Sequence, residues 1–186
     1  MQILKKITNH FIILSSLMCS SSFLSAQTAA IREYQVKAVF LFNFTQFVEW
    51  PSTSFSSPQA PFVIGILGND PFNSYLTEAI YGERVNGHPL VTQHYNTVEN
   101  VETCHILFIS QSEINNMENI LSRLKDRSIL TVSDANTFSQ YGGMIKFVTK
   151  NSKIQLKINP DAATAAKLVI SSKLLRSAEI FVPDKK

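Results

Sequence analysis

Three short apolar runs, each ended by small polar residues, constrain the fold of this chain most strongly. Continuous apolar runs of this length, bounded by turn-forming residues, are typical of strands that are buried on both faces of a sheet. Each run is followed by residues that suit a turn or a helix cap. The runs cover residues 62–67, 104–109 and 129–132, and they end at Gly68-Asn69-Asp70, Ser110-Gln111 and Ser133-Asp134.

Helical periodicity separates these runs. Phe72, Leu76 and Ile80 are spaced as one face of a helix, and a second helical segment is expected over residues 114–125. A further strand is expected over residues 89–95, after the turn-forming pair Asn86-Gly87. Two successive strand-helix-strand rounds predict the α/β class, as a layered α/β sandwich with a mixed sheet.

The last third of the chain has a different pattern. Residues 144–148 and 154–158 flank a polar turn, and apolar and polar residues alternate in the second of them. This alternation predicts a C-terminal antiparallel hairpin with one solvated face. Asn159-Pro160 then suits the start of a helix, and Ser171 suits the cap of a last short helix, with Val169 and Ile170 as the interruption between the two.

A helix is also expected near the start, over residues 29–48, ending near Trp50-Pro51. The N- and C-terminal helices therefore flank the predicted sheet. The apolar stripe of the first helix needs a partner surface, and the end of the chain offers one at compatible spacing. We expect these two groups to pack together with Trp50 nearby: Tyr34, Leu41, Phe44 and Val48 on the first helix, and Leu168, Ile170, Leu174 and Leu175 at the end.

The first 26 residues have the order of a secretory signal peptide. Lys5 and Lys6 precede a mostly apolar stretch, and small residues gather before Ala26. The apolar stretch is interrupted by polar residues and is too short to span a membrane. We therefore expect export to the periplasm with cleavage near Ala26, and a single domain over residues 27–186. Cys19 lacks the preceding small residue that a lipoprotein signal normally shows.

The charge and the cysteine content limit which functions and which stabilising bonds the chain can have. The formal net charge of +3 falls to +1 when Lys5 and Lys6 leave with the signal, so nothing favours nucleic-acid binding. No later segment reaches membrane-spanning length, which excludes membrane insertion after cleavage. Cys104 is then the remaining cysteine, which excludes an intrachain disulfide. It is expected to be a buried apolar group, with a redox-sensing thiol as the alternative.

The sequence offers little for catalysis. It contains no Gly-rich phosphate loop, no helical histidine pair with an intervening Glu, and no nucleophile elbow. Ser122 and Lys125 have the spacing of a serine-lysine pair, but charged neighbours indicate a solvated helical face. The histidines at 88, 94 and 105 match no metal-binding spacing. We therefore expect no enzyme activity, no cofactor and no metal.

Binding candidates come from position in the fold. Ligands of open α/β sheets settle beyond the carboxyl ends of the strands, so Asn69, Ser110 and Ser133 are candidates, with helix and turn capping as the alternative. Gly142 and Gly143 suit a tight turn or the close approach of a partner. Phe44 and Trp50 are core residues or interface anchors, and Lys173, on the outer face of the last helix, is a candidate partner contact.

Six segments, in order, resemble the YfiR/HmsC-like periplasmic family. Together they cover nearly all of the chain that follows the signal. They are EYQVKAVFLFNFTQFVEWP at 33–51, FVIGILGNDPF at 62–72, CHILFIS at 104–110, ILTVSD at 129–134, GGMIKFV at 142–148 and ISSKLLRSA at 170–178.

This resemblance implies a periplasmic regulator that binds the periplasmic region of an inner-membrane diguanylate cyclase and holds it inactive, which lowers cyclic-di-GMP and restrains biofilm formation. It also implies an α/β domain that is often dimeric, so a homodimer is a further expected partner. The disulfides of the best-known members are not matched by Cys104 alone. The alternative function is a soluble small-ligand sensor that reports to a sensor kinase through the strand-end crevice.

Overall fold

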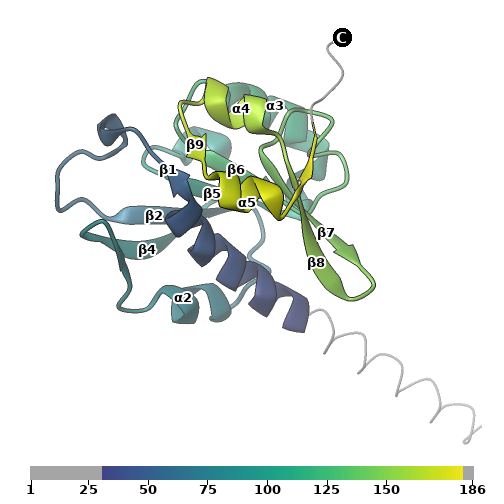
Figure 1. Cartoon of the computed structure of the whole chain (residues 1–186), viewed down its shortest axis with the longest axis horizontal. Coiled ribbons are helices and arrows are strands. Elements are labelled where there is room, and N and C mark those ends of the chain that lie inside the picture. Colours follow the sequence, from purple (N-terminus) through teal and green to yellow (C-terminus); the bar gives the residue numbers. More distant parts are fainter. Residues whose placement is uncertain (1–30, 182–186) are drawn as a thin grey trace, which may run out of the picture.

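The computed structural model describes residues 31–181, and the expected signal peptide lies outside these residues. Figure 1 shows a twisted sheet with helices on both sides. The sheet contains eight strands in the order β10-β8-β7-β6-β5-β2-β4-β3. Their bounds are β2 (Phe62–Leu67), β3 (Arg84–Val85), β4 (His88–Tyr95), β5 (Ile106–Ile109), β6 (Leu130–Ser133), β7 (Ile145–Lys150), β8 (Lys153–Ile158) and β10 (Glu179–Ile180).

The centre of the sheet is parallel, as the three buried runs predict. Strands β4, β2, β5, β6 and β7 run in one direction, β3 runs antiparallel to β4, and β8 runs antiparallel to β7 with β10 parallel to β8. The chain passes from β2 to β4 on one side and then crosses to β5 on the other side of β2. This reversal makes the junction of β2 and β5 the topological switch point of the sheet, where a ligand crevice is expected.

Helices cover the two faces of the sheet and divide the core into two clusters. On one face lie a helix over residues 31–47, α2 (Tyr75–Ile80), α4 (Pro160–Ala165) and α5 (Ser172–Arg176). On the other face lies α3 (Met117–Leu124), which buries Met117, Ile120, Leu121 and Leu124. Neighbouring residues of β5 alternate between the two clusters, as the pleat of a strand requires. The chain is therefore an α/β/α sandwich with a mixed sheet.

The two ends of the described chain pair with each other. Strand β1 (Val48–Glu49) follows the first helix directly and pairs antiparallel with β9 (Val169–Ile170) in a separate two-stranded sheet. The amide of Ser171 also donates to the carbonyl of Phe47 at 2.8 Å. Leu41, Phe44, Leu168 and Leu174 lie in the same buried cluster, with Trp50 packed at its margin. The expected packing of the first helix against the last segment is confirmed.

Several boundaries differ from the sequence prediction. Helix α2 begins at Tyr75, after a turn in which the Asp70 carboxylate accepts from the amide of Phe72. The hairpin turn is shorter than predicted, because Asn151 and Ser152 both adopt positive φ and join β7 to β8 directly. The two-residue strands β1, β3, β9 and β10 carry too few residues for a periodic signal. The expected caps are confirmed: Asn159 Oδ1 accepts from Ala162, and Ser171 Oγ accepts from Leu174.

Within residues 31–181, every helix is too short or too polar to cross a lipid bilayer.

Candidate functional site

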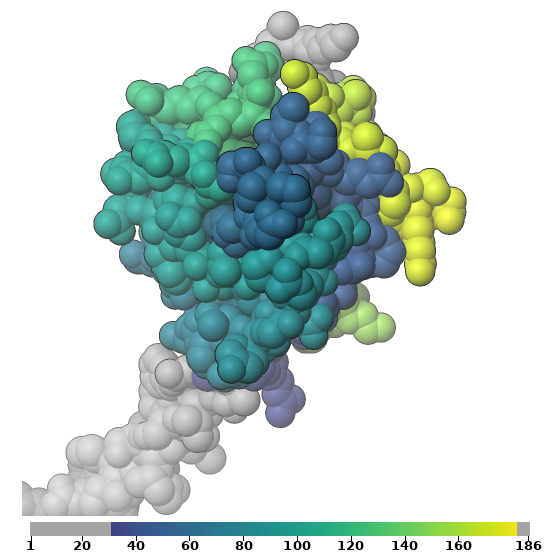
Figure 2. All heavy atoms as spheres, turned by 90° about the vertical axis from the view of Figure 1, so that its left-hand side faces the viewer, coloured from purple at the N-terminus to yellow at the C-terminus, as the bar shows by residue number. Residues whose placement is uncertain are grey.

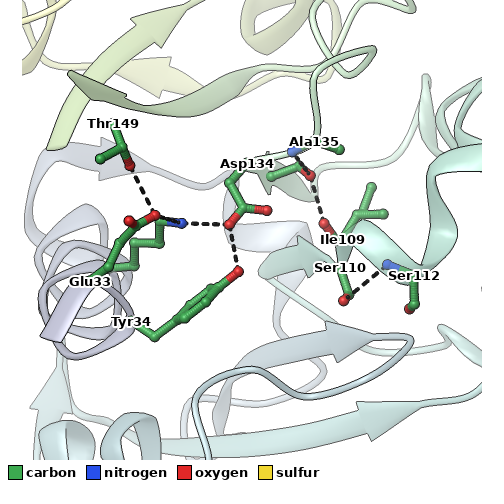
Figure 3. Close-up of polar contacts among 10 residues, drawn as sticks. Glu33, Tyr34, Ile109, Ser110, Ser112, Asp134, Ala135 and Thr149 are labelled. Atoms are coloured by element: carbon green, nitrogen blue, oxygen red, sulfur yellow. Dashed lines mark hydrogen bonds and ion pairs between the residues drawn. The ribbon is translucent and has the colours of Figure 1, made fainter. Parts of the chain in front are cut away.

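A buried ion pair lies at the carboxyl ends of the strands, where the sequence predicts a ligand crevice. Asp134 follows the last residue of β6, and its Oδ2 lies 2.5 Å from Nζ of Lys37 on the first helix (Figure 3). The Lys37 side chain is 1% exposed and that of Asp134 is 6% exposed. The pair joins the helix to the sheet through the core.

Two further side chains complete this cluster. The Tyr34 hydroxyl donates to the same Asp134 oxygen at 2.8 Å, and the Lys37 ammonium lies 4.3 Å from the centre of the Tyr34 ring. Glu33, one turn before Lys37, pairs with its Nζ at 2.6 Å and accepts from Thr149 of β7 at 2.9 Å. Burial, followed by the Asp134 charge, raises the pKa of the Tyr34 phenol above its usual range.

The cluster fits a structural role. A buried Lys ammonium without a partner would lose much of its hydration energy, and here two carboxylates and an aromatic face surround it. One buried oxygen, Oδ1 of Asp134, has no hydrogen-bond partner among the described residues. The rest of the cluster is satisfied internally, so the groups that could contact a ligand already bind each other.

The two serines at the strand ends are also used internally. The Ser133 hydroxyl is fully buried, donates to the carbonyl of Ile109 at 2.6 Å and accepts from the amide of Ala135 at 3.0 Å. The buried Ser110 hydroxyl accepts from the amide of Ser112 at the start of η3 (Gln111–Asn116). Both take the capping role that the sequence left open, and contact of either serine with a ligand stays a prediction.

The turn that follows β5 lies against the switch point. Gly68 has a φ of +86°, and a Cβ added there would lie 2.4 Å from Ser112 Oγ and 2.7 Å from Glu113 Oε1. The amide of the exposed Asn69 donates to Ser112 Oγ at 3.0 Å. The η3 turn therefore borders this point, and the ligand crevice expected there stays a prediction.

The other binding candidates differ in how far their side chains are exposed to solvent. Phe44 is fully buried and stacks on Phe147, so it is a core residue and not an accessible interface anchor. Gly142 has a φ of +84° and is partly exposed, whereas Gly143 lies under the Phe138 ring, 2.3 Å from where a Cβ would be. Lys173 is exposed, as predicted, with its Nζ 5.4 Å from the centre of the Phe47 ring.

At the opposite ends of the strands, which we call the amino edge of the sheet, an open cavity lies beside Trp50. It has a volume of about 330 Å³ and lies at the amino ends of β2 and β4. The segments that line it meet on the face shown in Figure 2, where the blue loop after Trp50 lies between the teal β3–β4 region and the end of the first helix. Its lining residues are Thr45, Val48, Glu49, Trp50, Phe55, Phe62, Val85, Asn86 and His88.

A stack of rings forms the wall behind this cavity. Phe55 lies between His88 and His105, with ring centres 3.9 and 4.5 Å away, and His105 stacks on Phe62 at 4.6 Å. The Trp50 ring meets Phe62 edge to face, and its indole N–H donates to the carbonyl of His105 at 3.1 Å. These contacts hold the Trp50 ring in one orientation.

His105 is neutral in this arrangement. Its Nδ1 accepts from the amide of Val63, so the proton lies on Nε2, which donates to the carbonyl of Ser54. Burial lowers the pKa of His105 from 6.5 to about 4. A proton on Nδ1 would break the bond to Val63, so the neutral ring is part of the folded structure.

The remaining candidates for a reactive or metal-binding role are His94, Ser122 and Cys104. His94 is exposed, with its Nε2 3.6 Å from Asp70, and Ser122 donates to the carbonyl of Asn119 on its own helix. Cys104 is buried, and burial raises the pKa of its thiol to about 12, as expected for an unreactive apolar group. No group of three metal-ligating side chains comes together in the part of the chain that the structure describes.

Sequence reasoning missed the most distinctive polar contacts. Lys37 stands on the apolar stripe of the first helix, and a cation at such a position is a signal for a buried counter-ion. Asp134 follows a buried strand, but nothing in the sequence pairs it with Lys37, because the contact spans most of the chain. The ring stack likewise depends on tertiary packing of the loop after Trp50.

Comparison with known proteins agrees with the six segments. The model of the YfiR/HmsC-like family matches residues 34–179, which include both edges of the sheet described above. No curated protein matches the chain. Because the match covers most of the chain, the protein belongs to the YfiR/HmsC-like family.

Proposed function

We propose that this protein holds an inner-membrane diguanylate cyclase inactive by binding the cyclase's periplasmic region. The exported unit would be the domain over residues 27–186. Loss of this contact would release the cyclase, raise cyclic-di-GMP and promote biofilm formation. The family match over residues 34–179 is the observation that carries the proposal.

The family supports the general class of function. YfiR-like proteins are periplasmic and regulatory, and they act in general on cyclic-di-GMP signalling through a membrane partner. The identity of this chain's own partner, and the inhibitory direction of its action, are the specific content of the proposal.

The surface of the first helix supports a binding role. Val36 and Val39 point away from the core and are 46% and 50% exposed, although the opposite face of the same helix is buried. Lys173 lies beside this helix, over the Phe47 ring. An apolar surface with an adjacent cation suits contact with a protein partner, because such interfaces combine apolar anchors with a polar rim. We refer to Val36, Val39 and Lys173 as the outer helix surface.

Deletion of the gene in its native host tests the function. Cyclic-di-GMP should rise when residues 27–186 are deleted and should return to its original level when the wild-type chain is restored. An unchanged level, with the cyclase gene intact, would contradict the proposal.

A pair of surface variants tests the contact. Val39→Asp should fail to restore repression while keeping a normal melting temperature, because Val39 is half exposed and has little packing to lose. Ile114→Asp, an equivalent change at an exposed site on η3, is the matched control and should restore repression fully. If both variants restore repression equally, the outer helix surface is not the contact.

A further inference from the structure

We propose that the cavity beside Trp50 binds a small organic cation, such as a quaternary or primary ammonium compound. This site is separate from the outer helix surface and lies at the opposite sheet edge from the crevice that the sequence predicts. The proposal goes beyond the regulatory function and does not depend on it, because it concerns the isolated chain.

The size and walls of the cavity suit a small organic molecule. Its volume of about 330 Å³ lies at the lower end of the range of about 300 to 1,000 Å³ for small-molecule sites. Trp50 is an aromatic lining residue, Val48 and Val85 are buried apolar neighbours, and Phe55 adds an apolar ring edge because its two faces are stacked on His88 and His105. Aromatic faces attract cations through the ring quadrupole, and tryptophan does so best.

The charge of the lining favours a cation over an anion. Glu49 carries the one carboxylate among the lining residues, and the described residues that line the cavity include no lysine or arginine. His105, behind the wall, is held neutral by its hydrogen bonds to Val63 and Ser54. A bound anion would therefore meet a carboxylate and find no opposite charge.

The hydrogen-bonding groups also suit an ammonium ligand. Nδ1 of His88 lies 2.7 Å from the carbonyl of Ala60, which can only accept, so Nδ1 carries a proton. In the neutral ring the second nitrogen, Nε2, is then an acceptor. The indole N–H of Trp50 is already used by the carbonyl of His105, so Trp50 has no donor left for a ligand. Glu49 and His88 together provide acceptors for the N–H groups of a primary ammonium ion or for the hydroxyl group of choline, whose quaternary nitrogen carries no hydrogen.

The site is organised before a ligand arrives. The Phe55 ring is fixed between two imidazoles, and Trp50 is fixed by its hydrogen bond and by Phe62. A preformed site loses less conformational entropy on binding, which favours recognition of a ligand with few contacts.

Trp50 makes the proposal directly testable, because it is the only tryptophan in the chain. The experiment is a fluorescence titration of the purified full-length protein with choline and with 3,3-dimethylbutan-1-ol, its uncharged analogue of the same shape. Choline should change the Trp50 emission with a Kd in the millimolar range, and the alcohol should bind at least about tenfold more weakly, because it lacks the charge. Equal binding of the two compounds, or no response to about 50 mM choline, would overturn the proposal.

A matched pair of variants locates the charge that is recognised. Glu49→Gln keeps the size of an exposed side chain and should weaken choline binding about fivefold. Glu118→Gln, at an exposed position on α3, should leave the Kd unchanged. An unchanged Kd in Glu49→Gln would overturn the proposal.

A final measurement distinguishes a free cation from a lipid headgroup. Vesicles of phosphatidylcholine should leave the Trp50 emission unchanged under conditions in which free choline alters it. A response to vesicles without a response to free choline would overturn the proposal, because the cavity would then serve a membrane surface.

Discussion

The two edges of the sheet use polar and aromatic residues in opposite ways. At the carboxyl edge, Lys37, Asp134 and Tyr34 bind one another inside the protein, and the η3 turn lies against the switch point. At the amino edge, Trp50 and Phe55 border an open cavity whose carboxylate, Glu49, is exposed. Polar residues at strand ends therefore do not by themselves mark a ligand site. The accessible edge is the one at which an open cavity remains beside the packed side chains.

The first helix links the two edges. It begins beside the buried ion pair and ends beside the cavity, and its 17 residues (31–47) span about 25 Å at the usual rise of an α-helix. The first helix thus carries residues of the buried ion cluster near its start and leads to the cavity at its end. The predictions that follow test how far the two edges differ.

Removal of the buried carboxylate should have the largest effect. Asp134→Asn leaves the Lys37 ammonium with Glu33 as its one carboxylate partner among residues 31–181, and breaking a buried ion pair costs about 3–5 kcal/mol. Urea denaturation at neutral pH measures the loss. Asp126→Asn, at an exposed position, is the control and should change the stability by less than about 0.5 kcal/mol. Equal stabilities of the two variants would mean that the carboxyl edge does not depend on its ion pair.

Truncation of one buried side chain of the last helix should have the next largest effect. It tests how much the packing of this helix stabilises the amino edge of the sheet. Leu174 is buried against the first helix, so Leu174→Ala should cost about 2–4 kcal/mol. The exposed Lys173→Ala should leave the stability within about 0.5 kcal/mol of the wild type. Trp50 emission during unfolding reports both values. A harmless Leu174→Ala would contradict the packing of the two chain ends.

Much of the fold, but less of the site, could be predicted from the sequence. Local patterns indicate the buried strands, the hairpin and the caps at Asn159 and Ser171, because each depends on neighbouring residues. Burial of Phe44 instead of an interface role depends on its contact with Phe147, over a hundred residues away. The position of Ser112 beside Gly68 depends on the path of a turn. Such contacts between distant segments leave no periodic signal.

Acidification should destabilise the amino edge by an intermediate amount. The folded protein holds His105 neutral, with its pKa lowered to about 4, while the unfolded chain takes up this proton near pH 6.5. Stability should therefore be complete above pH 6.5, fall as the pH drops toward 4, and lose about 1–3 kcal/mol from this residue.

The variant His105→Asn isolates this contribution. An asparagine offers one donor and one acceptor without titrating, so the difference in unfolding free energy between pH 7 and pH 4.5 should be smaller than in the wild type. His94→Asn, at an exposed histidine, should retain the wild-type difference. If the dependence on pH is the same in all three proteins, His105 does not limit the stability at low pH.

The smallest effect is expected at the margin of the ion cluster. Glu33 is 29% exposed, so its charge is screened by water, and Glu33→Gln should cost less than about 1 kcal/mol. Comparison with Asp134→Asn in the same denaturation assay separates the stability that comes from Asp134, the buried partner of Lys37, from the stability that comes from Glu33, the partly exposed partner. A loss at Glu33 equal to that at Asp134 would mean that the cluster acts as a single unit.

The pairing of β1 with β9 also determines when, during folding, the native structure can be completed. Val48 lies near the start of the folded region and Ile170 near its end, so their strand pair cannot form until almost the whole chain is available for folding. Until then the apolar stripe of the first helix lacks the Leu168 and Leu174 side chains that cover part of it. Synthesis from the N-terminus therefore delivers the closing strand last, and a chain truncated before Ile170 would retain an uncovered apolar surface.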